Sequence, residues 1–131
     1  MPNNNWDAAI KQLYPADDGT KNFAEMVSLG KAFDVIASVE IGKNLREFVD
    51  GDRLTVTVIN HSKMAVVTNR TVARTLVPQS APLTEDLKVD IDPGWTADEG
   101  DVLEAVATYK AQAGIHTDFS STTSHLFTVV P

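Results

Sequence analysis

The stretch TADEGDVLEAVATYKAQAG, residues 96–114, decides the fold that the sequence predicts. Thr96 and Glu99 have the spacing of a capping box, in which each side chain accepts a hydrogen bond from the other residue's backbone N–H. Apolar and small residues then recur at helical spacing, and Gly114 suits the position just beyond a helix end. The stretch therefore predicts one amphipathic helix whose alanine-rich stripe must cover a sheet or a neighbouring chain.

Three runs with strand-like alternation precede this predicted helix. In the first, the even positions Leu54, Val56 and Val58 are apolar and the odd positions are mainly polar, which is typical of a half-buried antiparallel strand. The three runs are Arg53–Lys63, Ala65–Val77 and Asp86–Asp92. Their order predicts an antiparallel meander that leads into the helix, and hence an α+β fold.

The first fifty residues predict further β-structure. Asp18-Gly19 is a strong hairpin signal, and Phe33–Ile41 alternates with a period of two. A helix over Ala24–Val39 is the competing interpretation, but two glycines in and beside it would weaken it. We therefore predict a single domain over residues 1–131, with an N-terminal hairpin and strands (1–50), a β-meander (51–95), and a helix with a tail (96–131).

Composition narrows the possible functions. The net charge is −7 and the pI is near 4.7, which argues against a generic nucleic-acid binder because such proteins carry an excess of basic residues. The chain has no cysteine, which excludes disulfides and cysteine-ligated metal. No apolar stretch is long enough to span a bilayer, so we expect no membrane partner.

Motifs for catalysis or metal binding do not stand out. His61, His116 and His125 have no partner residue at metal-ligand spacing. The acidic residues at the start of the predicted helix suit the helix dipole. Asp90 and Asp92 form an acid pair on a wet strand face, where an acid pair can bind a cation, although solubility is the commoner reason for it. We predict no catalytic residue, no metal and no cofactor.

One group of polar residues is better placed for binding. If the three strands pair in sequence order, hydroxyls and spaced cations share one polar sheet face, which can meet phosphates and unstacked bases. The same alternation also produces an ordinary solvated sheet face. The candidate RNA-binding residues are Thr55, Thr57, His61, Lys63, Arg70, Arg74 and Lys88.

Over most of its length the chain resembles the coat proteins of single-stranded RNA bacteriophages, the levivirus type. The resemblance rests on chain length, the hairpin around Ala16–Thr20, the meander over residues 53–77, and the strand Asp86–Asp92 that runs into the predicted helix. It implies a homodimer with a continuous antiparallel sheet and C-terminal helices that pack on the partner. It further implies an icosahedral capsid with RNA on the inner sheet face, located in the virion after assembly in the host cytoplasm.

Two other classes of protein stay open. A small dimeric α+β enzyme or ligand-binding domain would form an apolar cavity between sheet and helix that converges on His61, Arg70 or Tyr109. A phage head-decoration subunit would bind capsids but no RNA.

Overall fold

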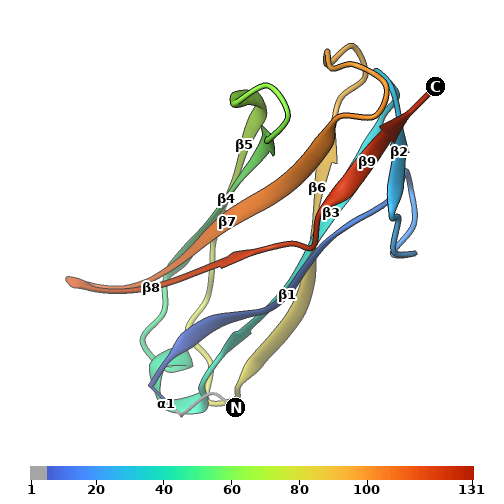
Figure 1. Cartoon of the computed structure of the whole chain (residues 1–131). Coiled ribbons are helices and arrows are strands. Elements are labelled where there is room, and N and C mark those ends of the chain that lie inside the picture. The colour runs from blue at the N-terminus through green and yellow to red at the C-terminus, as the bar shows by residue number, and fades with distance from the viewer. Residues whose placement is uncertain (1–5) are drawn as a thin grey trace.

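The computed structural model describes residues 6–131, and almost all of its regular secondary structure is β-strand (Figure 1). Strands account for 61% of the chain and helix for 3%, so the predicted α+β fold with a C-terminal helix is wrong. Within the described residues, no helix is long and apolar enough to cross a membrane. In chain order the elements are β1 (Ala8–Asp17), β2 (Met26–Ser28), β3 (Phe33–Ile41), α1 (Lys43–Arg46), β4 (Gly51–Asn60), β5 (Ala65–Thr75), β6 (Leu83–Ile91), β7 (Val102–Ala113), β8 (His116–Thr123) and β9 (Phe127–Val130).

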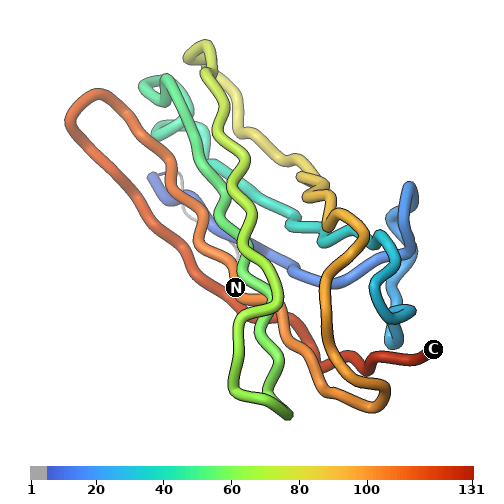
Figure 2. The backbone as a smooth tube through the Cα atoms, turned by 90° about the horizontal axis from the view of Figure 1, so that it is seen from above, coloured from blue at the N-terminus to red at the C-terminus, as the bar shows by residue number. Residues whose placement is uncertain are grey.

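The strands form two sheets that share one hydrophobic core (Figures 1 and 2). The smaller sheet has three antiparallel strands in the order β1-β3-β6. The larger sheet has six strands in the order β2-β9-β7-β4-β5, with β8 also paired to β7, and its β2–β9 pair is parallel. Buried side chains of both sheets belong to the same core cluster, so the molecule is a β-sandwich.

The central strand β4 confirms the clearest sequence pattern. Leu54, Val56 and Val58 are fully buried, and the residues between them face outward. Burying side chains of this size contributes roughly 1.5–3 kcal/mol each. The alternation of β4 therefore fixes which face of the larger sheet meets the core.

Strand β7 occupies most of the stretch that was predicted to be helical. Every second side chain of β7 points into the core, beginning with Leu103 and including Tyr109. The other inward residues are alanines, at 105, 107, 111 and 113. Two of the inward alanines of β7 lie opposite larger valines of β4, in the pairs Val56–Ala107 and Val58–Ala105, so large and small side chains alternate across these positions.

The predicted capping box is a tight turn instead. Gly100 has a φ of +87°, which an α-helix cannot accommodate. The Asp101 carboxylate accepts a hydrogen bond from the backbone N–H of Asp98 at 2.8 Å and another from Asn60 Nδ2 at 2.8 Å. The turn is thereby fastened to the end of β4. Gly114 also has a positive φ, of +62°, but it belongs to the β7–β8 turn and not to a helix end.

The predicted meander is correct for two strands and wrong for the third. β4 and β5 pair antiparallel after a short turn. β6 leaves this sheet and pairs with β3 in the smaller one. Its inward residues Leu87, Val89 and Ile91 are buried there. The two faces of β6 were thus predicted correctly, whereas its neighbour was not.

Both ends of the chain differ from the expectation. β3 has the predicted bounds, which excludes the competing helix, but its partner is β1. The chain does reverse at Asp18-Gly19 as predicted, but the hairpin is very short: it consists of the antiparallel bridge Ala16–Phe23 and its flanking backbone hydrogen bonds, and Met26–Ser28 then pairs with β9. The C-terminal tail forms β8 and β9 of its own sheet, with Phe127 and Val129 buried. The tail and β7 therefore complete their own domain, and residues 96–131 contain no helix that could pack on a partner.

Candidate functional site

The seven residues predicted to bind RNA do not share one face. Thr55 and Thr57 lie on the outer face of the larger sheet, with His61 just after β4. Lys63 lies in the β4–β5 turn, and Lys88 lies on β6, which belongs to the other sheet. The remaining two, Arg70 and Arg74, lie opposite the buried residues Val56 and Asp52 and so face the inner side of β5. The structure therefore brings only part of the predicted constellation together.

The outer face of the larger sheet is rich in hydroxyl groups. One row of hydroxyl side chains crosses the sheet from β5 through β4 and β7 to β8, and it consists of Thr71, Thr55, Thr108 and Ser121. Neighbouring hydroxyl oxygens lie 3.3 Å apart in the pairs Thr55–Thr71 and Thr108–Ser121. Because these groups satisfy one another and also face solvent, this row is an ordinary polar sheet surface.

Arg74 belongs to a buried network at the start of β4. Its Nε and Nη2 donate to the two oxygens of Asp52 at 3.0 and 2.6 Å, and Nη1 donates to Glu85 on β6. The Tyr109 hydroxyl donates to Asp52 Oδ2 at 2.6 Å. The hydrogen bonds to Asp52 raise the pKa of Arg74. Burial, followed by the hydrogen bond to Asp52, raises the pKa of Tyr109. The network joins the two sheets and leaves Arg74 fully engaged.

Carboxylates also face the other predicted cations. Hydrogen bonding to Asp98 raises the pKa of Lys63, which keeps it protonated. These contacts offset much of the positive potential that phosphate binding would need. The closest nitrogen–oxygen distances are 2.6 Å for Arg70–Asp92, 3.7 Å for Lys63–Asp101, 4.0 Å for Lys88–Asp34 and 3.0 Å for His61–Glu104.

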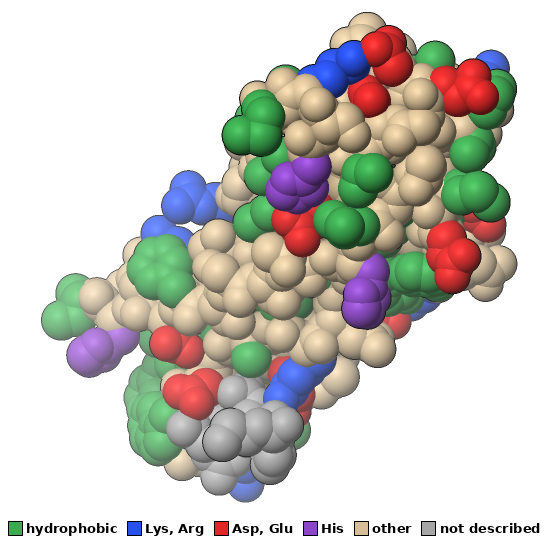
Figure 3. All heavy atoms as spheres, in the orientation of Figure 1, with side chains coloured by type: hydrophobic (Ala, Val, Ile, Leu, Met, Phe, Trp, Pro, Cys, Tyr) green, Lys and Arg blue, Asp and Glu red, His purple; other side chains and the backbone are tan. Residues whose placement is uncertain are grey.

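Large apolar side chains reach solvent in separate places on the molecule, as Figure 3 shows for one face. The most aromatic of them, here called the aromatic patch, consists of Trp6 and Phe48, which stack with ring centroids 6.1 Å apart and are 57% and 56% exposed. Leu45 and Ala113 lie beside the pair along an open groove of about 370 Å³. An exposed aromatic pair next to an apolar groove is typical of a protein–protein contact.

Two further apolar patches lie elsewhere. The β2–β9 patch consists of Phe23, Met26 and Leu126, which line one shallow depression. The hairpin patch consists of Met64 and Val66 at the tip of the β4–β5 hairpin. Sequence reasoning missed all three patches, because a local sequence window does not tell whether an apolar side chain is covered by another part of the chain.

His61, Arg70 and Tyr109 do not converge on a groove of the kind expected for an enzyme or ligand-binding domain. Several grooves indent the described part of the chain, and the most pronounced ones are lined by other residues. Tyr109 is fully buried and its hydroxyl is committed to Asp52. These three residues therefore have no common space in which a substrate could meet them.

Comparison with known proteins adds no family to these observations. No family model, no curated protein and no solved structure matches the chain.

Proposed function

We propose that the chain is a non-enzymatic structural subunit that assembles with copies of itself into a shell of the kind that encloses a viral genome. The observation that carries the proposal is the presence of apolar patches in separate places: the aromatic patch, the β2–β9 patch and the hairpin patch. Groups of exposed apolar side chains can mark protein–protein contact sites, because covering them with a second protein is favourable.

The separation of the patches favours an extended assembly over a single dimer. A two-fold dimer uses one self-complementary surface on each subunit. Contacts between different surfaces of neighbouring copies instead continue from subunit to subunit, and they give a ring or a shell where they close and an open filament where they do not. Because the described chain forms a complete sandwich, these contacts would join finished domains, and the exchange of helices between subunits is no part of the proposal.

The coat-protein resemblance implies RNA as the cargo. RNA binding has weaker support than the proposed assembly. Each predicted cation faces a carboxylate, and the net charge is −7. The outer face around Thr55 and Thr57 offers neutral hydroxyl groups, which an ordinary polar sheet surface also carries. RNA content is therefore measured separately from assembly.

Light scattering after size exclusion, together with negative-stain microscopy, tests the proposal at micromolar protein. We expect uniform particles, and we expect the double variant Trp6→Ser/Phe48→Ser to shift most of the protein to small species. Phe119→Ser is the matched control, because Phe119 is an exposed aromatic residue outside the three patches. A clean monomer for the unmodified chain would contradict the proposal, and binding of such a monomer to preformed phage heads would indicate a decoration subunit. RNA that survives nuclease treatment of the particles would support the cargo.

A further inference from the structure

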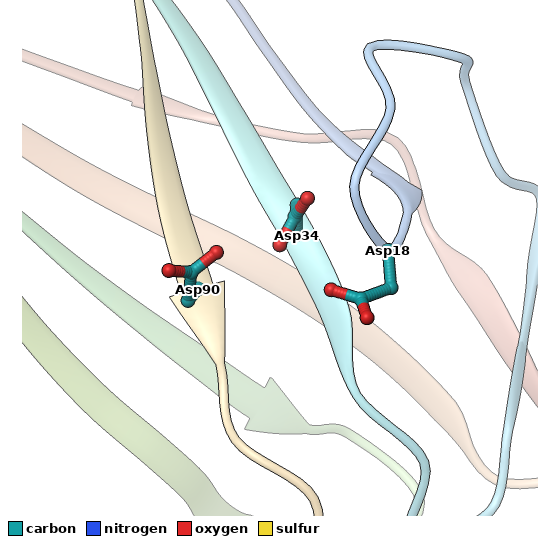
Figure 4. Close-up of side chains that lie close together, drawn as sticks. All are labelled: Asp18, Asp34 and Asp90. Carbon is teal, nitrogen blue, oxygen red and sulfur yellow. The ribbon is translucent and has the colours of Figure 1, made fainter.

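Three aspartates from distant parts of the chain meet at one end of the smaller sheet, across the ends of its strands (Figure 4). Asp34 and Asp90 are directly opposite each other on β3 and β6. Asp18 lies in the turn after β1, and Figure 4 shows the carboxyl group of Asp34 between those of the other two. One carboxylate oxygen from each residue lies within 4.8 Å of the other two.

The central carboxylate is buried and only partly satisfied. The Asp34 side chain is 0% exposed. Its Oδ2 accepts a hydrogen bond from the backbone N–H of Gly19 at 2.9 Å, whereas its Oδ1 has no hydrogen-bond partner among the described residues. An ionised carboxylate in this position costs several kcal/mol unless a positive charge compensates it. The orphaned Oδ1 therefore points to a ligand that supplies positive charge.

The nearby ammonium group of Lys88 does not remove the free-energy cost of burying an ionised Asp34. The Lys88 ammonium lies 4.0 Å from Asp34 Oδ2, and its side chain is nearly half exposed, so its attraction is partly screened. Three carboxylates and one ammonium leave the cluster with an excess of negative charge when all are ionised.

The donor set narrows the choice of ligand. Carboxylate oxygens without nitrogen or sulfur donors suit a hard cation and disfavour zinc. Ca²⁺ accepts six to eight oxygen ligands in a flexible geometry, which suits carboxylates that come from two strands and a turn. Mg²⁺ demands a near-ideal octahedral geometry and is seldom held by protein ligands alone.

We propose that Asp18, Asp34 and Asp90 bind one Ca²⁺ ion. The ion would fasten the turn that contains Asp18 to the β3–β6 pair of the smaller sheet. Water and backbone carbonyls supply the remaining ligands that Ca²⁺ requires. This inference is independent of the proposed assembly, because every ligand side chain comes from one chain.

Calorimetric titration of the full chain with CaCl₂, after removal of metals with a chelator, tests the site. We expect saturable binding of one ion per chain and a rise in Tm of about 3–5 °C when free Ca²⁺ exceeds its Kd about tenfold. Asp34→Asn should abolish both effects while retaining the acceptor for the Gly19 N–H. Asp18→Asn serves as a second variant, because it removes one proposed ligand at an exposed turn position.

Asp50→Asn is the matched control, since it removes the same charge at an exposed position outside the cluster. It should bind Ca²⁺ with unchanged stoichiometry and with an affinity within about twofold, because charges beyond about 10 Å are largely screened. Absence of saturable heat in the unmodified chain would overturn the proposal. An equal Ca²⁺-dependent rise in Tm in the unmodified chain and in both cluster variants would overturn it as well, because the ion would then bind elsewhere.

Discussion

The hydroxyl group of Tyr109 stabilises the network around Asp52. Tyr109→Phe removes the hydroxyl that donates to Asp52 Oδ2 at 2.6 Å and leaves a buried carboxylate with fewer donors. We expect the free energy of unfolding to fall by about 1–3 kcal/mol, measured by urea denaturation. Tyr14→Phe is the control, because the Tyr14 hydroxyl makes an exposed hydrogen bond to the Lys21 carbonyl at 3.2 Å. Equal losses in both variants would show that the network adds nothing.

Asp101 gives a prediction for pH dependence. Hydrogen bonds from Asn60 and from the Asp98 backbone lower the pKa of Asp101 below its ordinary value of 3.8. A lowered folded-state pKa stabilises the fold above the unfolded-state pKa, and this contribution is lost as the pH falls through the folded-state pKa. Asp101→Asn should therefore lower Tm at neutral pH, and its difference from the unmodified chain should shrink below pH 3.8. A difference that does not change with pH would contradict this account.

At the scale of the element, strand β7 depends on its row of small inward residues. Ala107 is buried opposite Val56, so Ala107→Leu would force a larger side chain into a packed core and should cost about 1–3 kcal/mol or more. Val106→Leu is the matched control on the outer face and should change stability by less than about 0.5 kcal/mol. Urea denaturation measures both values. Similar losses of unfolding free energy in the two variants would contradict the assignment of one buried face and one outward face to β7.

The sequence predicted elements well where large branched residues alternated. Strands β3 and β4 were found because Val and Ile mark one face clearly. β7 was missed because alanine at every second position also satisfies the small-residue stripe of a helix. Gly100 was the available signal, since a glycine directly after the predicted first turn is unfavourable in a helix.

The candidate site was harder to predict than the strands. Alternation placed Thr55 and Thr57 correctly on an outward face. It could not show that β6 joins the other sheet, which takes Lys88 away from them. The aspartate cluster was equally invisible, because Asp18 and Asp90 are brought together only by the pairing of β1 and β6 with β3. Sequence spacing detects metal ligands only when they lie close together along the chain.

At the scale of the whole molecule, polar side chains close the two open sides of the sandwich. On one side, Asp118 and Ser120 of β8 accept hydrogen bonds from backbone N–H groups of Ala8 at 2.7 Å and Ile10 at 3.1 Å. On the other side, Arg74 of β5 contacts Glu85 of β6. Exposed strand edges invite uncontrolled pairing with other chains, and these contacts oppose it. The apolar patches are then the better candidates for specific association.

The salt dependence of assembly separates association through apolar patches from association driven by RNA. Copies of a chain with a net charge of −7 repel one another, and salt screens this repulsion because the Debye length falls from about 10 Å at 0.1 M to about 3 Å at 1 M. Contacts through the aromatic, β2–β9 and hairpin patches should therefore strengthen as salt increases. Assembly that depends on cation–phosphate contacts should weaken instead, because counterion release becomes less favourable.

Light scattering of nuclease-treated protein at increasing NaCl concentration measures directly whether assembly strengthens or weakens with salt. We expect the mean particle mass to rise or stay constant with salt, and the protein concentration needed for half-assembly to fall. The Trp6→Ser/Phe48→Ser variant should show little assembly at any salt concentration, because screening cannot replace the lost apolar area. Particles that dissociate on addition of salt would show that charge pairing, and not the apolar patches, holds the subunits together.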